Sequence, residues 1–407
     1  MSAVERLVRY CQIDTQSDPQ NESMTPSSAK QFDLAKILEK ELKEAGLEGV
    51  CLDEHCYVYG WLPSNMEENT KTVGFIAHMD TAPDYSGNGV KPRLIENFDG
   101  NDIVLNEHMV THMSDFPEMK SAKGKTLLVT DGTTLLGADD KAGVTAIMEA
   151  MFYLKEHPEV RHGRIAVGFT PDEEIGNGPK YFDIGKFGAD FAYTMDGGTV
   201  REISDETFNA ASANVSFKGF SIHPGSAKDK MINAAAVACA YQNLLPEYMR
   251  PEHTEGRDGF IHLTSMQGNV EKAELSYILR DHDLTKLNEK KELMKKAVAY
   301  VNAIYGDDVC TIEITDAYHN MREVLDENPD AMQMAYKAFE QLGITPLHEA
   351  VRGGTDGAEL SLRGLPCPNL GVGGGNFHGP YEYCVVEELE QAREVILKII
   401  SNVAKGC

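Results

Sequence analysis

The sequence lacks the features that place a protein in a membrane or in a disulfide-stabilised fold. No stretch approaches about 18 consecutive apolar residues, and residues 1–14 resemble a charged amphipathic helix rather than a signal peptide. The eight cysteines have no CxxC spacing, which argues against a disulfide scaffold and against a zinc site built from thiolates. Internal repeats and proline-rich linkers are also absent. We therefore expect a soluble, cytoplasmic globular protein.

Basic residues are scarce relative to acidic ones. The chain has 38 lysine and arginine residues against 64 aspartate and glutamate residues, which gives a net charge of −26. A field of this sign repels phosphate groups, so we expect neither nucleic acid nor an anionic membrane as a partner. Acidic clefts in such a protein would instead attract cations, including metal ions and amines.

The 407 residues suffice for two or three domains. In the N-terminal half, short apolar runs alternate with helical patterns such as 27–46, which begins with serine cap candidates and ends at a glycine. This alternation predicts an α/β fold with a mostly parallel sheet. Residues 207–320 follow the order βαββαβ, which is typical of a ferredoxin-like domain. We therefore predict one α/β domain, formed by 1–206 and 321–407, and an inserted domain at 207–320.

Acidic residues and histidines follow several of the predicted strands. His78 and Asp80 end the run 72–80, and residues two apart in a strand point to the same side, so they can share a site. The other residues of this kind are Asp139, Asp140, Asp172, Glu173, Glu174, Asp196 and His378. Taken singly, each could be a helix cap, a solvated turn or a loop residue. Ligands of open α/β sheets gather outside the carboxyl ends of the strands, so their joint occurrence favours one shared site.

The residue types in this set favour a metal site. Two histidines with several carboxylates and no cysteine suit Zn²⁺, Mn²⁺ or Co²⁺ better than a thiolate zinc site or an all-oxygen calcium site. The excess of carboxylates favours two ions that share a bridging acid, which is the layout of hydrolytic aminopeptidases. A carboxylate near an imidazole also fixes the tautomer of a metal-binding histidine, and Asp80 could have this role.

Longer strings link these residues to a known family. They are HMDTAPD, TTLLGADDKAG, FTPDEEIGNG, YTMDGG, HPGSAK, YHNMRE, RGGTDGAELS and GLPCPNL. Together they resemble the metallopeptidase family M20, and in particular its tripeptide aminopeptidases, over nearly the whole chain. The resemblance implies a zinc-dependent exopeptidase that releases the N-terminal residue from tripeptides. It also implies a small peptide substrate with a free N-terminus, and a homodimer in which the domain at 207–320 serves as lid and dimerisation domain.

The resemblance also implies a ligand set for two Zn²⁺ ions per chain, which Co²⁺ or Mn²⁺ could replace. His78 and Asp196 would hold one ion, and Glu174 and His378 would hold the other. Asp140 would bridge both ions, and the family often has a cis peptide bond next to the bridging aspartate.

The remaining implied roles concern catalysis and substrate binding. Asp80 would orient His78, and Glu173 would be the general base that activates a water molecule. His223, from the inserted domain, would donate a hydrogen bond to the oxyanion. Arg280 and Arg352 could bind the terminal carboxylate of the substrate as planar forks, or they could form salt bridges in this acidic chain. Further candidates for substrate binding are Asn320 and Lys228.

Two alternatives to this function stay open at the sequence level. One is another M20-type metallohydrolase, such as a dipeptidase or an N-acyl amino acid hydrolase, because the same metal ligands serve several substrates. The other is a non-catalytic peptide-binding member of the family. The presence of Glu173 beside a full set of ligand candidates argues against the second alternative.

Overall fold

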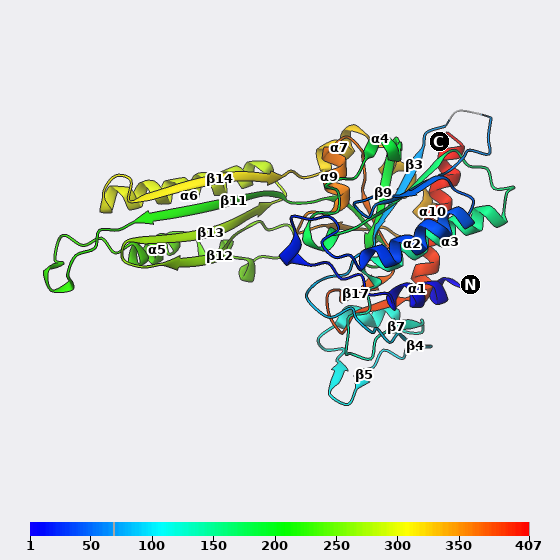
Figure 1. Ribbon diagram of the computed structural model, residues 1–407, viewed down its shortest axis with the longest axis horizontal. Coiled ribbons are helices and arrows are strands. Elements are labelled where there is room, and N and C mark those ends of the chain that lie inside the picture. Colours follow the sequence, from blue (N-terminus) through cyan, green and yellow to red (C-terminus); the bar gives the residue numbers. More distant parts are fainter. Residues whose placement is uncertain (68–69, 407) are drawn as a thin grey trace. The chain divides into compact units, whose positions relative to one another are not determined.

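The computed structural model describes residues 1–67 and 70–406 and divides into two compact units (Figure 1). The first unit comprises Met1–Asp205, Glu323–Glu349 and Thr355–Cys407, and the second comprises Glu206–Arg322 and Ala350–Gly354. Seven cysteines are free thiols, and Cys407 lies outside the described residues. None of the described helices combines the length and the apolar character needed to cross a membrane.

An eight-stranded sheet forms the centre of the first unit. Its strands are β1 (Glu48–Leu52), β2 (Val58–Leu62), β3 (Val73–His78), β8 (Ile165–Thr170), β9 (Phe191–Gly197), β10 (Glu202–Glu206), β15 (Leu347–Ala350) and β16 (Asn369–Gly371), in the spatial order β1-β2-β8-β3-β9-β16-β10-β15. The central strands β8, β3, β9 and β16 are parallel, whereas β1, β2 and β10 pair antiparallel with their neighbours. The predicted α/β class is confirmed, and the parallel pairs are the central ones.

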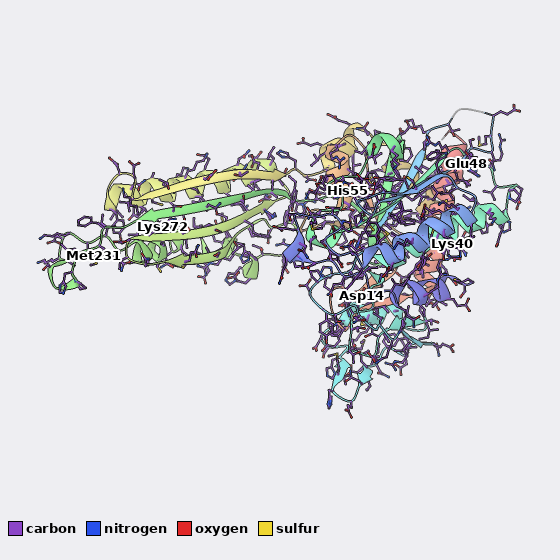
Figure 2. All side chains as sticks on the ribbon, viewed as in Figure 1. Asp14, Lys40, Glu48, His55, Met231 and Lys272 are labelled. Carbon is purple, nitrogen blue, oxygen red and sulfur yellow. The ribbon has the colours of Figure 1, made fainter. Side chains whose placement is uncertain are left out.

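Helices cover both faces of this sheet. The long helices pack on one face, and they are α1 (Ala3–Cys11), α2 (Gln31–Glu44), α3 (Ala138–Glu156), α8 (Asp330–Leu342) and α10 (Val386–Ala404). The short helices α4 (Ile184–Phe187) and α9 (Asp356–Leu362) pack on the other face. Successive strand residues point to opposite faces, so Phe75 of β3 packs in the first layer and Ile76 in the second. On the outer surface, α2 presents Lys40 to solvent (Figure 2).

Two smaller sheets complete the first unit. One has the order β17-β18-β7-β4, with β17 (Gly374–Gly375), β18 (Tyr383–Val385), β7 (Leu127–Val129) and β4 (Arg93–Ile95). The other pairs β5 (Ile103–Asn106) with β6 (Met109–Thr111). The first turn of α3 carries the acidic pair of the GADDKAG string, and the connection from β17 to β18 carries His378. These two segments therefore bring residues from outside the large sheet to its edge.

The second unit is an antiparallel sheet with two helices. Its elements are β11 (Asn209–Lys218), α5 (Ala234–Gln242), β12 (Phe260–Gly268), β13 (Lys272–Asp281), α6 (Leu284–Tyr305) and β14 (Cys310–Tyr318), and the strand order is β12-β13-β11-β14. Alternate residues of β13, from Ala273 to Leu279, are buried in the core that also contains the apolar residues of α5 and α6. Lys272 lies exposed at the start of this strand (Figure 2). The chain follows the βαββαβ order that the sequence predicts.

The segment Ala350–Gly354 belongs to the second unit, whereas the sequence prediction had placed it in the α/β domain. Two contacts explain the difference. The Phe208 amide donates to the Gly353 carbonyl at 3.3 Å, and the Arg352 guanidinium donates to the Gly256 carbonyl at 2.7 Å. Such long-range bonds leave no trace in local periodicity. The short helix α7 (Arg322–Glu327) lies at the boundary between the units along the chain.

Candidate active site

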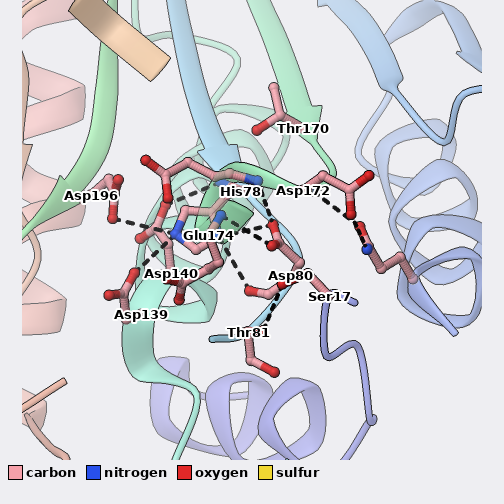
Figure 3. Close-up of polar contacts among 12 residues, drawn as sticks. Ser17, His78, Asp80, Thr81, Asp139, Asp140, Thr170, Asp172, Glu174 and Asp196 are labelled. Carbon is pink, nitrogen blue, oxygen red and sulfur yellow. Dashed lines mark hydrogen bonds and ion pairs between the residues drawn. The ribbon is translucent and has the colours of Figure 1, made fainter. Parts of the chain in front are cut away.

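His78 is the last residue of β3 and is 2% exposed. Its Nδ1 atom lies 3.3 Å from Asp80 Oδ1 and 3.2 Å from the Asp80 carbonyl oxygen. Its Nε2 atom lies 2.9 Å from Asp139 Oδ1 and 3.5 Å from Asp196 Oδ1 (Figure 3). One ring nitrogen therefore has a fixed partner while the other faces carboxylates. This is how a metal-ligating histidine is usually held.

His378 approaches the same carboxylates from the loop between β17 and β18. Its Nε2 atom lies 2.9 Å from Glu174 Oε2 and 3.4 Å from Asp139 Oδ2. The two oxygens of Asp139 therefore face one histidine each. Among the described residues, the buried Oε1 atom of Glu174 has no hydrogen-bond partner. A buried oxygen without a partner at the centre of such a cluster fits a site for a cation.

The resemblance implies that Asp140 bridges the two ions, but the contacts of its carboxylate differ from those expected for that role. It is fully buried, and its Oδ2 atom accepts from the His78 amide at 3.2 Å. Its Oδ1 atom accepts from the Gly143 amide at 3.1 Å. The Asp139–Asp140 peptide bond is cis. In this geometry Asp139, rather than Asp140, lies between the two histidines.

Asp80 links the histidine to the acidic turn after β8. Its Oδ1 atom accepts from the Glu173 amide at 3.0 Å, and its Oδ2 atom accepts from the Glu174 amide at 3.2 Å. These bonds hold the 3-10 turn Glu173–Ile175. Ligand atoms of His78, Glu173 and Asp196 lie within 4.8 Å of one another, as do those of His78, Asp139 and Glu174. Seven of the side chains named from the sequence therefore meet at one edge of the sheet, and they are His78, Asp80, Asp139, Glu173, Glu174, Asp196 and His378.

Glu382 supports the start of α3, where Asp139 lies, and the sequence analysis did not identify it. This carboxylate is 1% exposed and accepts from the amides of Leu136 at 2.7 Å, Gly137 at 2.8 Å and Asp139 at 3.0 Å. Gly137 has a φ of +80°, a conformation that favours glycine. A glutamate whose partners are backbone amides has no signature in the local sequence.

Asp172 supports the turn that carries Glu173. The sequence marks Asp172 as an acid at a strand end but gives it no role. Its carboxylate accepts from the Ser27 amide at 2.7 Å, the Ser27 hydroxyl at 2.5 Å and the Gln31 side-chain amide at 2.6 Å. Its own φ is +57°. The start of α2 thus holds the backbone immediately before the candidate base.

The site has more buried negative charge than its histidines can neutralise. Burial, together with repulsion by Asp139, raises the pKa of Glu174 to about 8. Burial also raises the pKa of Asp196 to about 7. Hydrogen bonds to Asp139 and Glu174 raise the pKa of His378 to about 11. Such a cluster must take up protons or bind cations, because uncompensated buried charge is costly.

Glu173 differs from Glu174 in its partners. Burial and the nearby charge of Asp196 raise the pKa of its carboxyl well above the usual value. No hydrogen bond joins its carboxylate to either site histidine among the contacts of the described residues, whereas Glu174 is paired with His378. A raised pKa brings a carboxylate toward the neutral range in which it can accept a proton and later return it.

The remaining sequence-predicted residues lie in the second unit, and they are His223, Arg280, Arg352, Asn320 and Lys228. His223 is exposed, and its Nδ1 atom accepts from the Gly225 amide at 3.1 Å, where it caps a 3-10 turn. Asn320 is 8% exposed, and its side chain donates to the His282 carbonyl at 3.1 Å and accepts from the Thr207 amide at 3.1 Å. The Asn320 side chain therefore holds the backbone of its own unit.

The two arginines also have partners within the second unit. Arg280 donates to the Leu279 carbonyl at 2.9 Å and lies over the ring of Tyr318. Arg352 donates to the carbonyls of Gly256 and Asp258, both at 2.7 Å. None of these acceptors is a carboxylate. These contacts are therefore not the salt bridges that the sequence left open as an alternative. The role of each arginine toward substrate stays a prediction.

Comparison with known proteins identifies the family. The model of the family described as Peptidase family M20/M25/M40 matches residues 130–402. The chain belongs to this peptidase family. Peptidase T of Clostridium acetobutylicum is 51% identical to this M20 chain over 404 residues, which cover 99% of both proteins. The resemblance inferred from the motifs is therefore confirmed.

Solved structures show the same fold. An aminopeptidase PepT from Bacillus cereus has a TM-score of 0.76 at 24% identity and covers 99% of this chain and 98% of its own. A tripeptidase from Staphylococcus aureus also has a TM-score of 0.76, at 22% identity, with the same coverage of 99% and 98%. These two likenesses concern the fold, and the site itself is described by the distances given above.

Proposed function

We propose that this M20 peptidase is a tripeptide aminopeptidase, which releases the N-terminal residue from small peptides with a free N-terminus. The observation that carries the proposal is the carboxylate of Asp139, whose two oxygens face His78 and His378 with Glu173 nearby. The full-length likeness to peptidase T supports the choice of substrate. We further propose that the enzyme acts in the cytoplasm and as a homodimer.

The donor set supports a centre of two Zn²⁺ ions, which Co²⁺ or Mn²⁺ could replace. His78 and Asp196 would hold one ion, and Glu174 and His378 would hold the other. Asp139 would bridge them, in place of Asp140. When bound, the two ions would polarise the scissile carbonyl and acidify a water molecule.

Glu173 performs the proton transfers in this proposal. Its carboxylate takes a proton from the attacking water and passes it to the nitrogen of the leaving amine, so that the peptide C–N bond breaks with no net change at the base. Asp80 holds the Glu173 amide and His78 at the same time, and so fixes the base relative to the imidazole. The raised pKa of Glu173 supports its assignment as the group that carries the proton.

We assign binding of the substrate to residues of the second unit. His223 would donate to the oxyanion, and within the described part of the chain its exposed ring is bonded to the Gly225 amide rather than to a carboxylate. Arg280 and Arg352 would bind the terminal carboxylate of the substrate. The buried Asn320 side chain is already bonded to the Thr207 amide and the His282 carbonyl, so we do not assign it this role. A carboxylate-binding group at a fixed distance from the metal centre would select peptide length.

Hydrolysis of three peptides tests the proposed function. Tri-alanine should be cleaved to alanine and di-alanine, and the cleavage should stop in the presence of a metal chelator. N-acetyl-tri-alanine and di-alanine should be cleaved at least about 10²-fold more slowly, because they lack the free amine or the required length.

Each other outcome of this assay would indicate a different function for the protein. Preferred cleavage of di-alanine would indicate a dipeptidase, and preferred cleavage of the acetylated peptide would indicate an N-acyl amino acid hydrolase. No cleavage of any peptide by the metal-loaded chain would indicate a binding protein. Each of these results contradicts the proposal.

A further inference from the structure

The outer ring nitrogen of His378 faces a carboxylate that has no role in the site described above. His378 Nδ1 lies 3.6 Å from Asp84 Oδ2, while its Nε2 atom faces Glu174 and Asp139. A histidine that binds a metal through one ring nitrogen almost always donates the other N–H to a carboxylate, a carbonyl or a water. Asp84 is in the position of such an acceptor.

Asp84 and Asp80 belong to the same loop, which follows β3. Asp80 Oδ1 lies 3.3 Å from His78 Nδ1, and Asp84 Oδ2 occupies the equivalent position beside His378. One short loop therefore supplies an outer carboxylate to each histidine of the site. The two histidines themselves come from segments about 300 residues apart in the chain, so the loop connects parts of the site that the sequence separates.

The backbone of this loop is held on both sides of Asp84. The side-chain amide of Gln16 donates to the Ala82 carbonyl at 3.1 Å and to the Tyr85 carbonyl at 2.9 Å. Pro83, immediately before Asp84, restricts the backbone further because its ring fixes φ. A carboxylate on such a braced segment can direct an imidazole, whereas one on a loose loop cannot.

We propose that Asp84 is a positioning residue for His378: it accepts the Nδ1–H and thereby keeps the tautomer in which Nε2 can bind an ion. The inference rests on the proposed function, because it requires His378 to be a metal ligand. The distance of 3.6 Å is in the range of an ion pair and is slightly longer than a direct hydrogen bond. A small rotation of the ring would bring the two atoms within hydrogen-bonding distance.

The exposure of the pair limits the size of the expected effect. The side chains of His378 and Asp84 are 46% and 63% exposed. Loss of an outer partner of a metal-binding histidine typically lowers metal affinity by about 10–100-fold, and solvent around this pair favours the lower end of that range. We therefore expect a loss of about 10-fold for one of the two ions.

Zinc titration of the metal-free chain against a chromophoric chelator tests the proposal. In Asp84→Asn, one equivalent of Zn²⁺ should bind as in the wild type and the other about 10-fold more weakly. Asp84→Glu, which keeps a carboxylate, should recover part of the loss. Thermal melting followed by circular dichroism verifies that each variant is folded.

Asp102→Asn is the matched control. Asp102 Oδ2 lies 2.7 Å from His112 Nδ1, and the two side chains are 49% and 53% exposed, close to the values of the Asp84 pair. His112 is outside the site, so this variant should bind both zinc equivalents as the wild type does.

The outcomes separate this inference from the proposed function. If the wild type binds two ions and Asp84→Asn binds both with unchanged affinity, the role of Asp84 is overturned while the metal centre stands. If the wild type binds no zinc, the proposed function and this inference both fail. A loss in Asp102→Asn equal to that in Asp84→Asn would overturn the inference as well, because the effect would then not depend on His378.

Discussion

Glu173 and Glu174 are adjacent in the chain but differ in their partners. Glu174 Oε2 lies 2.9 Å from His378 Nε2, and its side chain is 4% exposed. Glu173 shares its surroundings with His78 and Asp196, and among the described residues no histidine forms an ion pair with it as His378 does with Glu174. Asp80 binds both of their amides, so the turn fixes where each carboxylate points. These partners support the proposal that Glu174 binds a metal ion and that Glu173 transfers the proton.

Substitution of Glu173 by glutamine separates these two roles. Glu173→Gln keeps the size of the side chain but cannot accept a proton, so the rate of tripeptide hydrolysis should fall by about 10²–10⁴-fold. The zinc content should stay at the wild-type value, because Glu173 is not a ligand in this account. Metal analysis and a hydrolysis assay on the same preparation measure both effects.

Glu156→Gln provides the control for this prediction. Glu156 is an exposed residue at the end of α3, away from the residues of the site, and its substitution should alter neither zinc content nor rate. Wild-type turnover by Glu173→Gln, or a loss of zinc along with the activity, would contradict the role of Glu173 as the base.

The sequence predicted which residues gather at the site better than it predicted how they are arranged. His78, Asp80 and Asp196 were found because they lie at or near strand ends, where the pattern of apolar runs is clear. Asp139 and Asp140 are consecutive, and nothing in a local pattern shows which carboxylate faces the histidines. The choice depends on backbone amides: Asp140 binds those of His78 and Gly143, which leaves Asp139 to face the two imidazoles.

At the scale of elements, the site follows from the direction of the central strands. Strands β3, β8 and β9 are parallel, so their carboxyl ends meet at the same edge of the sheet. Helix α3 begins at this edge and packs closely on β3 and β9. The strand pattern could be predicted from sequence, whereas the close approach of α3 to the sheet could not.

Gly143 permits this close approach. A Cβ atom at position 143 would lie 2.0 Å from the Met195 carbonyl oxygen and 2.4 Å from Asp140 Oδ1. Glycine-to-alanine changes inside helices ordinarily stabilise by up to about 1 kcal/mol. We expect Gly143→Ala to lower the free energy of unfolding by about 1–3 kcal/mol instead, because backbone must move to accept the methyl group. The urea denaturation midpoint measures the change.

Gly185→Ala is the control for this prediction. Gly185 is an exposed glycine of α4, and the nearest atom to an added Cβ is Asp183 Oδ1 at 3.4 Å, an ordinary contact distance. This variant should be as stable as the wild type or slightly more stable. Equal stability of Gly143→Ala and Gly185→Ala would show that the packing of α3 on β9 is not as tight as described.

The start of α2 shows a limit of prediction at the same scale. The sequence pattern predicted a helix over 27–46 with serine caps, whereas α2 spans Gln31–Glu44. Ser27 instead donates to Asp172 through both its amide and its hydroxyl. Its partner is 145 residues away in the chain, so a local capping rule could not have identified this use of the serine.

At the scale of the whole molecule, the chain has a net negative charge, and the site is also rich in negatively charged side chains. The net charge of −26 includes the carboxylates that surround His78 and His378. Burial, together with repulsion by Asp139, raises the pKa values of Glu174 and Asp196, and bound cations would relieve this repulsion. The composition alone predicted an attraction to cations, and the folded chain concentrates that attraction at one edge of the sheet.

The division into units is the other large-scale feature that the sequence indicates. The βαββαβ order of the second unit could be predicted because each element has its own periodicity and boundaries. The assignment of Ala350–Gly354 to this unit could not, because it depends on contacts such as that of Arg352 with the Gly256 carbonyl. Local pattern therefore predicts elements and their order, and long-range hydrogen bonds decide where short connections belong.

The position of bound zinc tests the central claim most directly. Crystals of the zinc-loaded protein, measured on both sides of the zinc absorption edge, should give two anomalous peaks that flank the carboxylate of Asp139. One peak should lie beside His78 and Asp196, and the other beside Glu174 and His378. A single peak, or two peaks that flank Asp140 instead, would contradict this account of the site.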